Sequence, residues 1–170
     1  MTRKVLIVDG YNVIRSTPPY REIAERDLES ARAALVSDVA AYAVGQWDAR
    51  VVFDGGANEH SRGLPHTAAG ITVMFSRYGM DADTVVEGMA REEREKGVPT
   101  EVVTSDAQTQ WAVLGGSVVR RSSVEFADEL RSTERDWREY SKRRGARGRV
   151  EDLIDPAVRA TLSRWARGEE

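Results

Sequence analysis

The feature that most constrains the fold is a short, continuous apolar run near the start of the chain. Residues 5–8 read Val-Leu-Ile-Val and end directly at Asp9-Gly10. Such a run is typical of a strand that is buried on both faces, as in a parallel sheet. Further short apolar runs predict four more strands, over residues 50–53, 71–75, 101–104 and 117–120.

Helical patterns alternate with these strands. Apolar residues recur every three or four positions in several segments, and capping or stop signals bound them. Helices are predicted over residues 27–46, 83–96 and 107–114, from a capping box at 122–125, and from Asp155-Pro156 onward. We therefore expect an α/β protein with three layers, in which a mostly parallel five-stranded sheet carries helices on both faces and a C-terminal helical tail follows.

The remaining segments predict loops. Pro18-Pro19 indicates a loop over residues 16–20, and residues 55–70 hold four glycines, one proline and both histidines, which favours a long mobile loop. The arginine- and glycine-rich stretch 143–149 reads as a flexible joint. With 170 residues, one main domain is expected, over residues 1–145, followed by a linker and helix over 146–170.

Composition excludes several classes of site. The chain has no cysteine and only His60 and His66 as histidines, so thiolate zinc sites, cysteine nucleophiles and histidine-rich metal centres are ruled out. Any metal must be held mainly by oxygen, which favours Mg²⁺ or Mn²⁺. No apolar run approaches ~20 residues and the first apolar run is too short for a signal peptide, so we expect a cytoplasmic protein without membrane contact.

Charge is distributed unevenly along the chain. Residues 1–130 carry 14 basic and 20 acidic side chains (−6), residues 131–149 carry 8 and 3 (+5), and residues 150–170 carry 3 and 5 (−2). A basic block on an acidic protein suggests contact with a polyanion, and a solvated helix face is the alternative.

Aspartates follow the predicted strands. Asp9, Asp54 and Asp106 each stand at or just beyond a strand end, where open α/β sheets place their sites. Asp83 and Glu87 lie four residues apart on one helical face, after the third strand. The alternative is that each aspartate caps the following helix, and for Glu87 that it is a solvated helix residue.

Carboxylates that converge on one point repel one another unless a cation or protons intervene. A hard divalent ion resolves this, activates a water and stabilises charge on a phosphate. The chain lacks the glycine patterns of dinucleotide folds and P-loops, and no Asp-x-Asp follows the first strand. Phosphodiester hydrolysis therefore fits the acidic set best.

The segment 8–12, Val-Asp-Gly-Tyr-Asn, resembles the opening motif of NYN domains in the PIN-like nuclease superfamily. Further matches keep the family's order and make the chain similar to the YacP family; they are residues 51–54, Ala82-Asp83 with Glu87, 103–106, 110–112 and 120–123. Bacterial members include a ribosome-associated endoribonuclease that cuts mRNA in the A site. The resemblance implies a PIN-like sheet, a divalent-metal site and RNA cleavage.

The resemblance also implies roles for individual residues. Asp9, Asp83 and Asp106 match the acidic metal-site positions, and Asp54 is a further expected member. Asn12 would position a water or phosphate. Ser105 would orient a carboxylate or contact a phosphate.

Several residues are candidates for binding RNA, each with a plainer alternative. Tyr11 could stack on a base or merely close the site. Arg120 and Arg121 could bind phosphates or form surface ion pairs. His60 and His66, beside Arg62, could touch RNA or be exposed residues without a role, and core packing is expected for Trp111. The basic block could contact RNA through Arg138, Lys142, Arg143, Arg144, Arg147 and Arg149.

We therefore expect a metal-dependent endoribonuclease that uses Mg²⁺ or Mn²⁺ and cuts RNA, with mRNA on the ribosome as the implied substrate. The alternatives are a non-catalytic module that binds RNA or the ribosome, and a nuclease toxin with an antitoxin. The cleavage sequence, the number of ions and the oligomeric state stay open.

Overall fold

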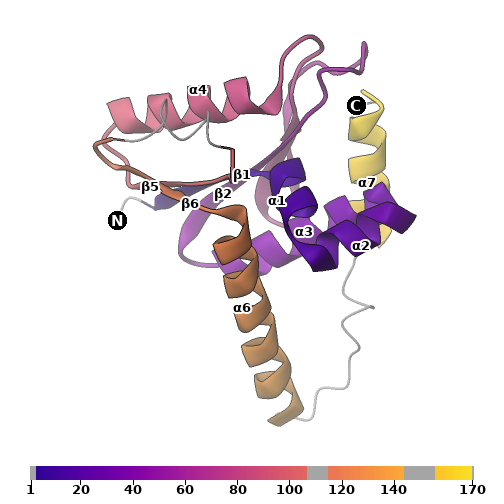
Figure 1. Ribbon diagram of the computed structural model, residues 1–170, viewed down its shortest axis with the longest axis vertical. Helices are drawn as coiled ribbons and strands as arrows, with labels where there is room; N and C mark the ends of the chain where they lie inside the picture. Colours follow the sequence, from indigo (N-terminus) through magenta and orange to yellow (C-terminus); the bar gives the residue numbers. More distant parts are fainter. Residues whose placement is uncertain (1–2, 107–114, 144–155, 170) are drawn as a thin grey trace.

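The computed structural model describes residues 3–106, 115–143 and 156–169, and the side chains of residues 136–143 are outside that description. The chain forms one sheet with helices around it (Figure 1). In order, its elements are β1 (Lys4–Asp9), α1 (Gly10–Ser16), α2 (Pro18–Arg26), α3 (Leu28–Ala43), β2 (Trp47–Phe53), β3 (Pro65–Ala68), β4 (Ile71–Phe75), α4 (Ala82–Glu95), β5 (Thr100–Val103), β6 (Val118–Arg121), α6 (Ser123–Arg143) and α7 (Pro156–Ala166).

The sheet has the strand order β3-β4-β2-β1-β5-β6. Five of the strands run parallel, and β1 lies inside the sheet between β2 and β5. Val8 is in register with Val51 of β2 and with Val103 of β5. All five predicted strands are present, and their carboxyl ends meet at one edge.

The sixth strand corrects the expected number of five. Within the predicted loop 55–70, β3 pairs antiparallel with β4, with Thr67 opposite Thr72. The two strands are joined by Ala69 and Gly70, both with positive φ, which is the geometry of a tight hairpin turn. Because Pro65 and two nearby glycines dominate the local sequence, the edge strand was not predicted.

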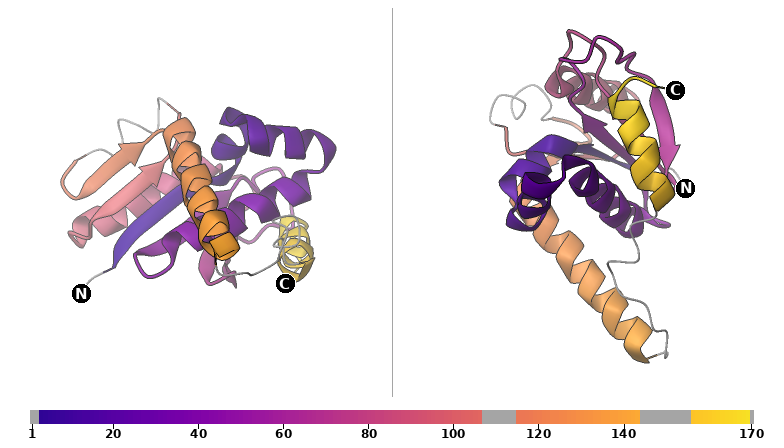
Figure 2. Two further views of the ribbon diagram at one scale, coloured as in Figure 1. Left: turned by 90° about the horizontal axis from the view of Figure 1, so that it is seen from below. Right: turned by 90° about the vertical axis from the view of Figure 1, so that its right-hand side faces the viewer.

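Helices cover both faces of the sheet, as predicted (Figure 2). Val5 and Ile7 face one cluster, which α4 covers with Val86, whereas Leu6 and Val8 face the other. This alternation explains the continuous apolar run, because every residue of β1 after Lys4 is buried. The larger cluster is closed by α1, α3, α6 and α7.

Local capping signals set several helix starts. Asp81 accepts a hydrogen bond from the backbone N–H of Thr84 at the start of α4, and Ser122 and Glu125 form the predicted capping box before α6. The expected loop 16–20 is wrong. Only Thr17 interrupts the helices there, since Pro18 and Pro19 occupy the first turn of α2, where their missing N–H groups cost nothing.

The C-terminal helix α7 packs into the main body of the protein (Figure 1). Leu162 is fully buried in the larger core, and Trp165 packs against that core. The helix contacts α3 and β4. The predicted helix over 107–114, with Trp111, and the expected joint over 144–149 lie outside the described residues. No helix in the described part of the chain is both long and apolar enough to cross a membrane.

Candidate active site

Asp9 is a buried carboxylate at the carboxyl end of the central strand. It has 5% of its surface exposed, and its Oδ1 accepts a hydrogen bond from the backbone N–H of Asn12 at 3.1 Å. Burial, together with the neighbouring carboxylate of Asp83, raises the pKa of Asp9 to about 6, against the lowering effects of the Asn12 N–H and Arg15. Removing a carboxylate from water disfavours its charged form.

Asp83 lies in the first turn of α4 and is half-buried. Its carboxylate is close enough to act on Asp9 through both charge and hydrogen bonding. The structure therefore joins these two predicted residues, although 74 positions separate them in the sequence. Asp81, not Asp83, caps α4, which leaves the Asp83 side chain available to face the strand ends.

A polar network holds the elements around Asp9 together. The side-chain oxygen of Asn12 accepts hydrogen bonds from the backbone N–H of Ser105 at 2.8 Å and from the hydroxyl of Ser123 at 2.6 Å. The Ser105 hydroxyl in turn accepts the backbone N–H of Ser123 at 3.0 Å. Asn12 thus connects the ends of β1 and β5 to the start of α6. Ser123 is predicted as part of the capping-box segment, but its place in this network was not predicted.

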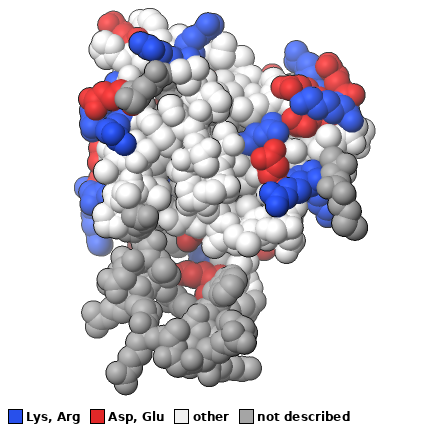
Figure 3. All heavy atoms as spheres, turned by 180° about the vertical axis from the view of Figure 1, so that it is seen from behind, with Lys and Arg blue, Asp and Glu red and all other residues white. Residues whose placement is uncertain are grey.

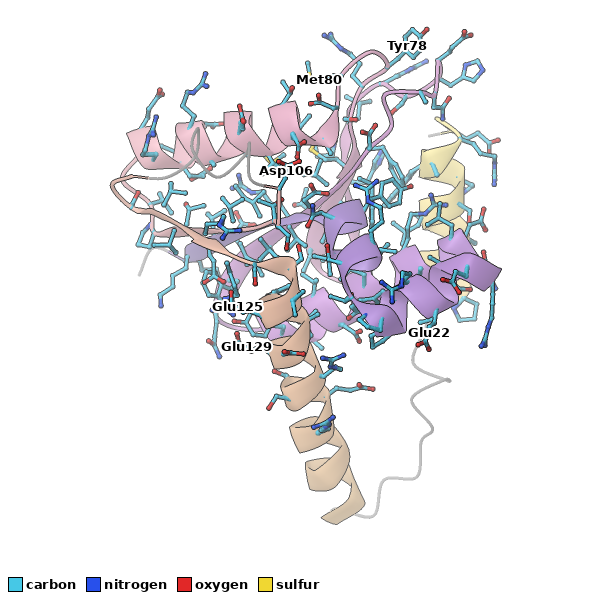
Figure 4. The ribbon with its side chains drawn as sticks, in the orientation of Figure 1. Glu22, Tyr78, Met80, Asp106, Glu125 and Glu129 are labelled. Carbon is cyan, nitrogen blue, oxygen red and sulfur yellow. The ribbon has the colours of Figure 1, made fainter. Side chains whose placement is uncertain are left out.

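Asp106 follows β5 at the same end of the sheet as Met80 (Figure 4). It is half-buried, and its backbone N–H donates to the hydroxyl of Thr104 at 3.1 Å. Arg120 donates to the backbone carbonyl of Thr104 at 2.9 Å, so this arginine braces the strand end that carries Ser105 and Asp106.

Asp54 follows β2, the strand next to β1, and its carboxylate is engaged in its own turn. It is exposed, and its Oδ1 accepts the backbone N–H of Gly56 at 2.8 Å, so its carboxylate shapes the turn after β2. Within the described ranges, no group of three or more acidic or histidine side chains is arranged to hold a metal ion.

The donor set at Asp9 and Asp83 suits a hard divalent cation. Mg²⁺ is commonly bound through one or two carboxylates while it keeps several waters. A buried carboxylate with a raised pKa beside a second carboxylate is the electrostatic situation that a cation relieves. The residues present therefore fit the ion that the sequence implied.

The loops after β2 and β4 are joined by hydrogen bonds, in contrast to the predicted mobile loop. Ser76 is fully buried; its hydroxyl accepts the N–H of Gly55 and donates to the carbonyl of Met80. The Ser61 hydroxyl donates to the Ser76 carbonyl at 2.7 Å. A Cβ at Gly55 would lie 2.4 Å from that carbonyl, so only glycine allows this approach.

Several predicted RNA-binding side chains are engaged inside the protein. The Tyr11 hydroxyl accepts a hydrogen bond from Arg32 at 2.8 Å, and the Tyr11 ring lies 5.1 Å from that of Phe53. Arg121 pairs with Glu101 and Glu129, which is the ion-pair alternative.

The basic block is described only in part. Arg143 ends α6 with its side chain outside the description, and Arg144 lies beyond the described residues. On the face opposite to Figure 1, described charges of both signs are interspersed around an uncharged middle (Figure 3).

Comparisons with known proteins give a consistent result. The sequence model of the YacP-like NYN domain matches residues 6–167. The Bacillus subtilis protein described as uncharacterized protein YacP is 29% identical over 172 residues, which cover 97% of this chain and 98% of that protein.

Two solved structures are also similar. The crystal structure of Rae1 (YacP) from Bacillus subtilis has a TM-score of 0.66 and 27% identity, over 97% of this chain and 95% of that one. A tryptophan-to-leucine mutant of Rae1 (YacP) has a TM-score of 0.69 and 26% identity, over 94% of this chain and 98% of that one.

Proposed function

Because the chain belongs to the YacP-like NYN domain family, we propose that it is a divalent-metal-dependent endoribonuclease that hydrolyses RNA phosphodiester bonds, with mRNA on the ribosome as its substrate. The NYN domain is a PIN-like nuclease fold, so both the fold and the family support a nuclease-type function. The metal, the RNA specificity and the ribosome are the parts that this proposal adds.

The observation that carries the proposal is the pairing of Asp9 and Asp83 at the carboxyl edge of the sheet. When bound there, Mg²⁺ or Mn²⁺ would supply an activated water and stabilise charge on the phosphate. Asp9 would hold the ion from a buried, fixed position. Asp83 would hold it from the first turn of α4.

Neighbouring residues position this pair and the substrate. Asn12 fixes the turn that presents Asp9, because its side chain is itself held by Ser105 and Ser123. Asp106, at the end of the adjacent strand, would act on the ion or on the water from the other side of Asp9. Arg120 would keep that strand end in place through the Thr104 carbonyl. Asp54, whose carboxylate accepts a hydrogen bond within the turn after β2, would influence how the substrate reaches the site.

The test compares cleavage of one mRNA on translating ribosomes and free in solution, with Mg²⁺, with Mn²⁺ and with EDTA. The wild type is expected to cut in the presence of metal, and Asp9→Asn is expected to lose cleavage by at least about 100-fold. Asp128→Asn on the exposed surface of α6 is the matched control and should cut normally. Cleavage that survives EDTA or Asp9→Asn would overturn the proposal.

A non-catalytic module that binds RNA or the ribosome is the second candidate. It is favoured by the engagement of Asp54 in its own turn and by the described residues holding no group of three or more acidic or histidine side chains arranged around one metal position. RNA binding without cleavage, unchanged by Asp9→Asn, would support this candidate.

A further inference from the structure

A pocket lies between the loop after β2 and the C-terminal helix, away from Asp9 and Asp83. It is a shallow hollow that is open to solvent, and its enclosed part of about 20 Å³ has room for little more than one water molecule. Its lining includes His60, Arg62, His66, Phe75 and Trp165. Neither the histidines nor α7 has a role in the proposed metal site.

The wall formed by α7 is fixed to the loop. Asn58 donates a hydrogen bond from Nδ2 to the backbone carbonyl of Ala166 at 2.5 Å, at the end of the helix. Gly168 has a φ of 75°, and a Cβ there would lie 2.3 Å from the carbonyl oxygen of His60. This close backbone approach fixes the position of α7 relative to the loop after β2.

Two aromatic rings form one side of the pocket. His66 of β3 and Trp165 of α7 stack with their centroids 4.1 Å apart and an angle of 16° between the planes. Both side chains are half-buried, so part of each ring stays accessible to solvent. Flat aromatic surfaces of this kind hold unpaired bases of single-stranded RNA.

The polar side chains of the pocket favour an anionic ligand. His60 and Arg62 are exposed at its rim and can donate hydrogen bonds to phosphate oxygens. The acidic residue in the lining, Glu169, is held by Arg167 through bonds of 3.1 and 3.3 Å, which offsets its charge.

The pocket belongs to the same edge of the sheet as the carboxylate pair. Phe75, in its lining, ends β4, and Asp9 ends β1, with β2 between them. Two strand spacings amount to about 10 Å. The Phe53 ring bridges this distance, since it contacts Gly10 on one side and stacks on Phe75, 5.3 Å away, on the other.

We propose that the surface of this pocket is an RNA subsite, across which one nucleotide of the strand being cut lies, with its base against the exposed parts of the Trp165 and His66 rings and its phosphate near His60 and Arg62. The proposal rests on the proposed function, because it takes the substrate to be single-stranded RNA. It gives the C-terminal helix a role in holding substrate at a fixed distance from the scissile bond.

The test measures binding of a fluorescein-labelled single-stranded oligoribonucleotide to the full chain in EDTA, so that no cleavage is required. Arg62→Ala should weaken binding about fivefold and lower the slope of log affinity against log salt by about one. Trp165→Ala should weaken binding about 10- to 100-fold, and Trp165→Phe, which keeps a ring, should lose less. Arg164→Ala, an exposed arginine on the same helix, is the matched control.

Circular dichroism and thermal unfolding of each variant separate lost binding from lost folding. If folded Arg62→Ala and folded Trp165→Ala both bind within twofold of Arg164→Ala, while the wild type still cuts RNA, the subsite is refuted and the nuclease stands. If the wild type neither binds nor cuts RNA, the proposed function fails first and the subsite with it.

Discussion

The side-chain oxygen of Asn12 accepts the hydroxyl of Ser123 at 2.6 Å, although 111 positions separate the two residues. The same oxygen accepts the backbone N–H of Ser105. The Asn12 side chain, in the helix that follows β1, therefore connects this part of the chain to the end of β5 and to the start of α6. The geometry around Asp9 depends on this connection.

Replacing Asn12 should reveal that dependence. Asn12→Ala leaves the Ser105 N–H and the Ser123 hydroxyl without their acceptor, so we expect a loss of about 1–3 kcal/mol in the free energy of unfolding. Ser123→Ala removes one of the two bonds and should cost less. Urea unfolding measures both, and an Asn12→Ala variant as stable as the wild type would contradict this role.

The raised pKa of Asp9, about 6, predicts how the metal-free protein responds to pH. Between pH 4 and pH 6 the unfolded chain gives up this proton while the folded chain keeps it, so stability falls as the pH rises through that window. Above pH 6 the full penalty remains, up to about 3 kcal/mol.

Asp9→Asn removes this penalty. In EDTA at pH 7.5 the variant should be more stable than the wild type, and the difference should shrink as the pH approaches 4. Thermal unfolding across pH measures this, with Asp128→Asn as the control. A variant that is less stable than the wild type at pH 7.5 would argue against a strained carboxylate.

Two glycines predict opposite effects of the same substitution. A Cβ at Gly10 would lie 2.3 Å from the fully buried Phe53 ring, whereas a Cβ at Gly88, inside α4, meets nothing within 4 Å. Gly10→Ala should therefore destabilise the protein by about 1–3 kcal/mol. Gly88→Ala should stabilise it by up to about 1 kcal/mol, through helix propensity. Urea midpoints for the two variants should move in opposite directions.

Arg121 should matter for stability more than for RNA binding. Its Nε lies 2.6 Å from Oε1 of the buried Glu101. Arg121→Ala leaves that buried carboxylate without its cationic partner, and we expect the free energy of unfolding to fall by up to about 3 kcal/mol. The double variant with Glu101→Gln should recover part of this loss. Weaker RNA binding by Arg121→Ala without any loss of stability would instead indicate a phosphate contact.

Much of the fold could be predicted from local sequence. Residues 5–8, 50–53, 71–75, 101–104 and 117–120 are apolar runs whose lengths and flanking turns fit buried parallel strands, and all five are strands of the sheet. The edge strand β3 could not be predicted, because its pairing with β4 depends on a neighbour and its own sequence contains Pro65 and His66. The prolines at 18 and 19 indicated a loop, although proline is also well tolerated in the first turn of a helix.

The candidate site was predictable where it depends on strand ends. Asp9 and Asp83 meet because parallel strands bring their carboxyl ends, and the helices that follow, to one edge. The partners of Asn12 and of Tyr11 could not be predicted, since these contacts join segments far apart in the sequence. The same holds for the stack of His66 on Trp165, which requires α7 to pack beside β4.

The central claim is that Asp9 and Asp83 together hold a divalent ion that RNA cleavage requires. The most direct test is Mn²⁺ binding by the wild type, Asp9→Asn, Asp83→Asn and the control Asp128→Asn, measured by calorimetry, with cleavage of a labelled RNA followed in parallel. We predict that the wild type and Asp128→Asn bind Mn²⁺ and cut the RNA, and that both site variants lose binding and cleavage together. Site variants that cut RNA as the wild type does, or a wild type that cuts in EDTA, would contradict the claim.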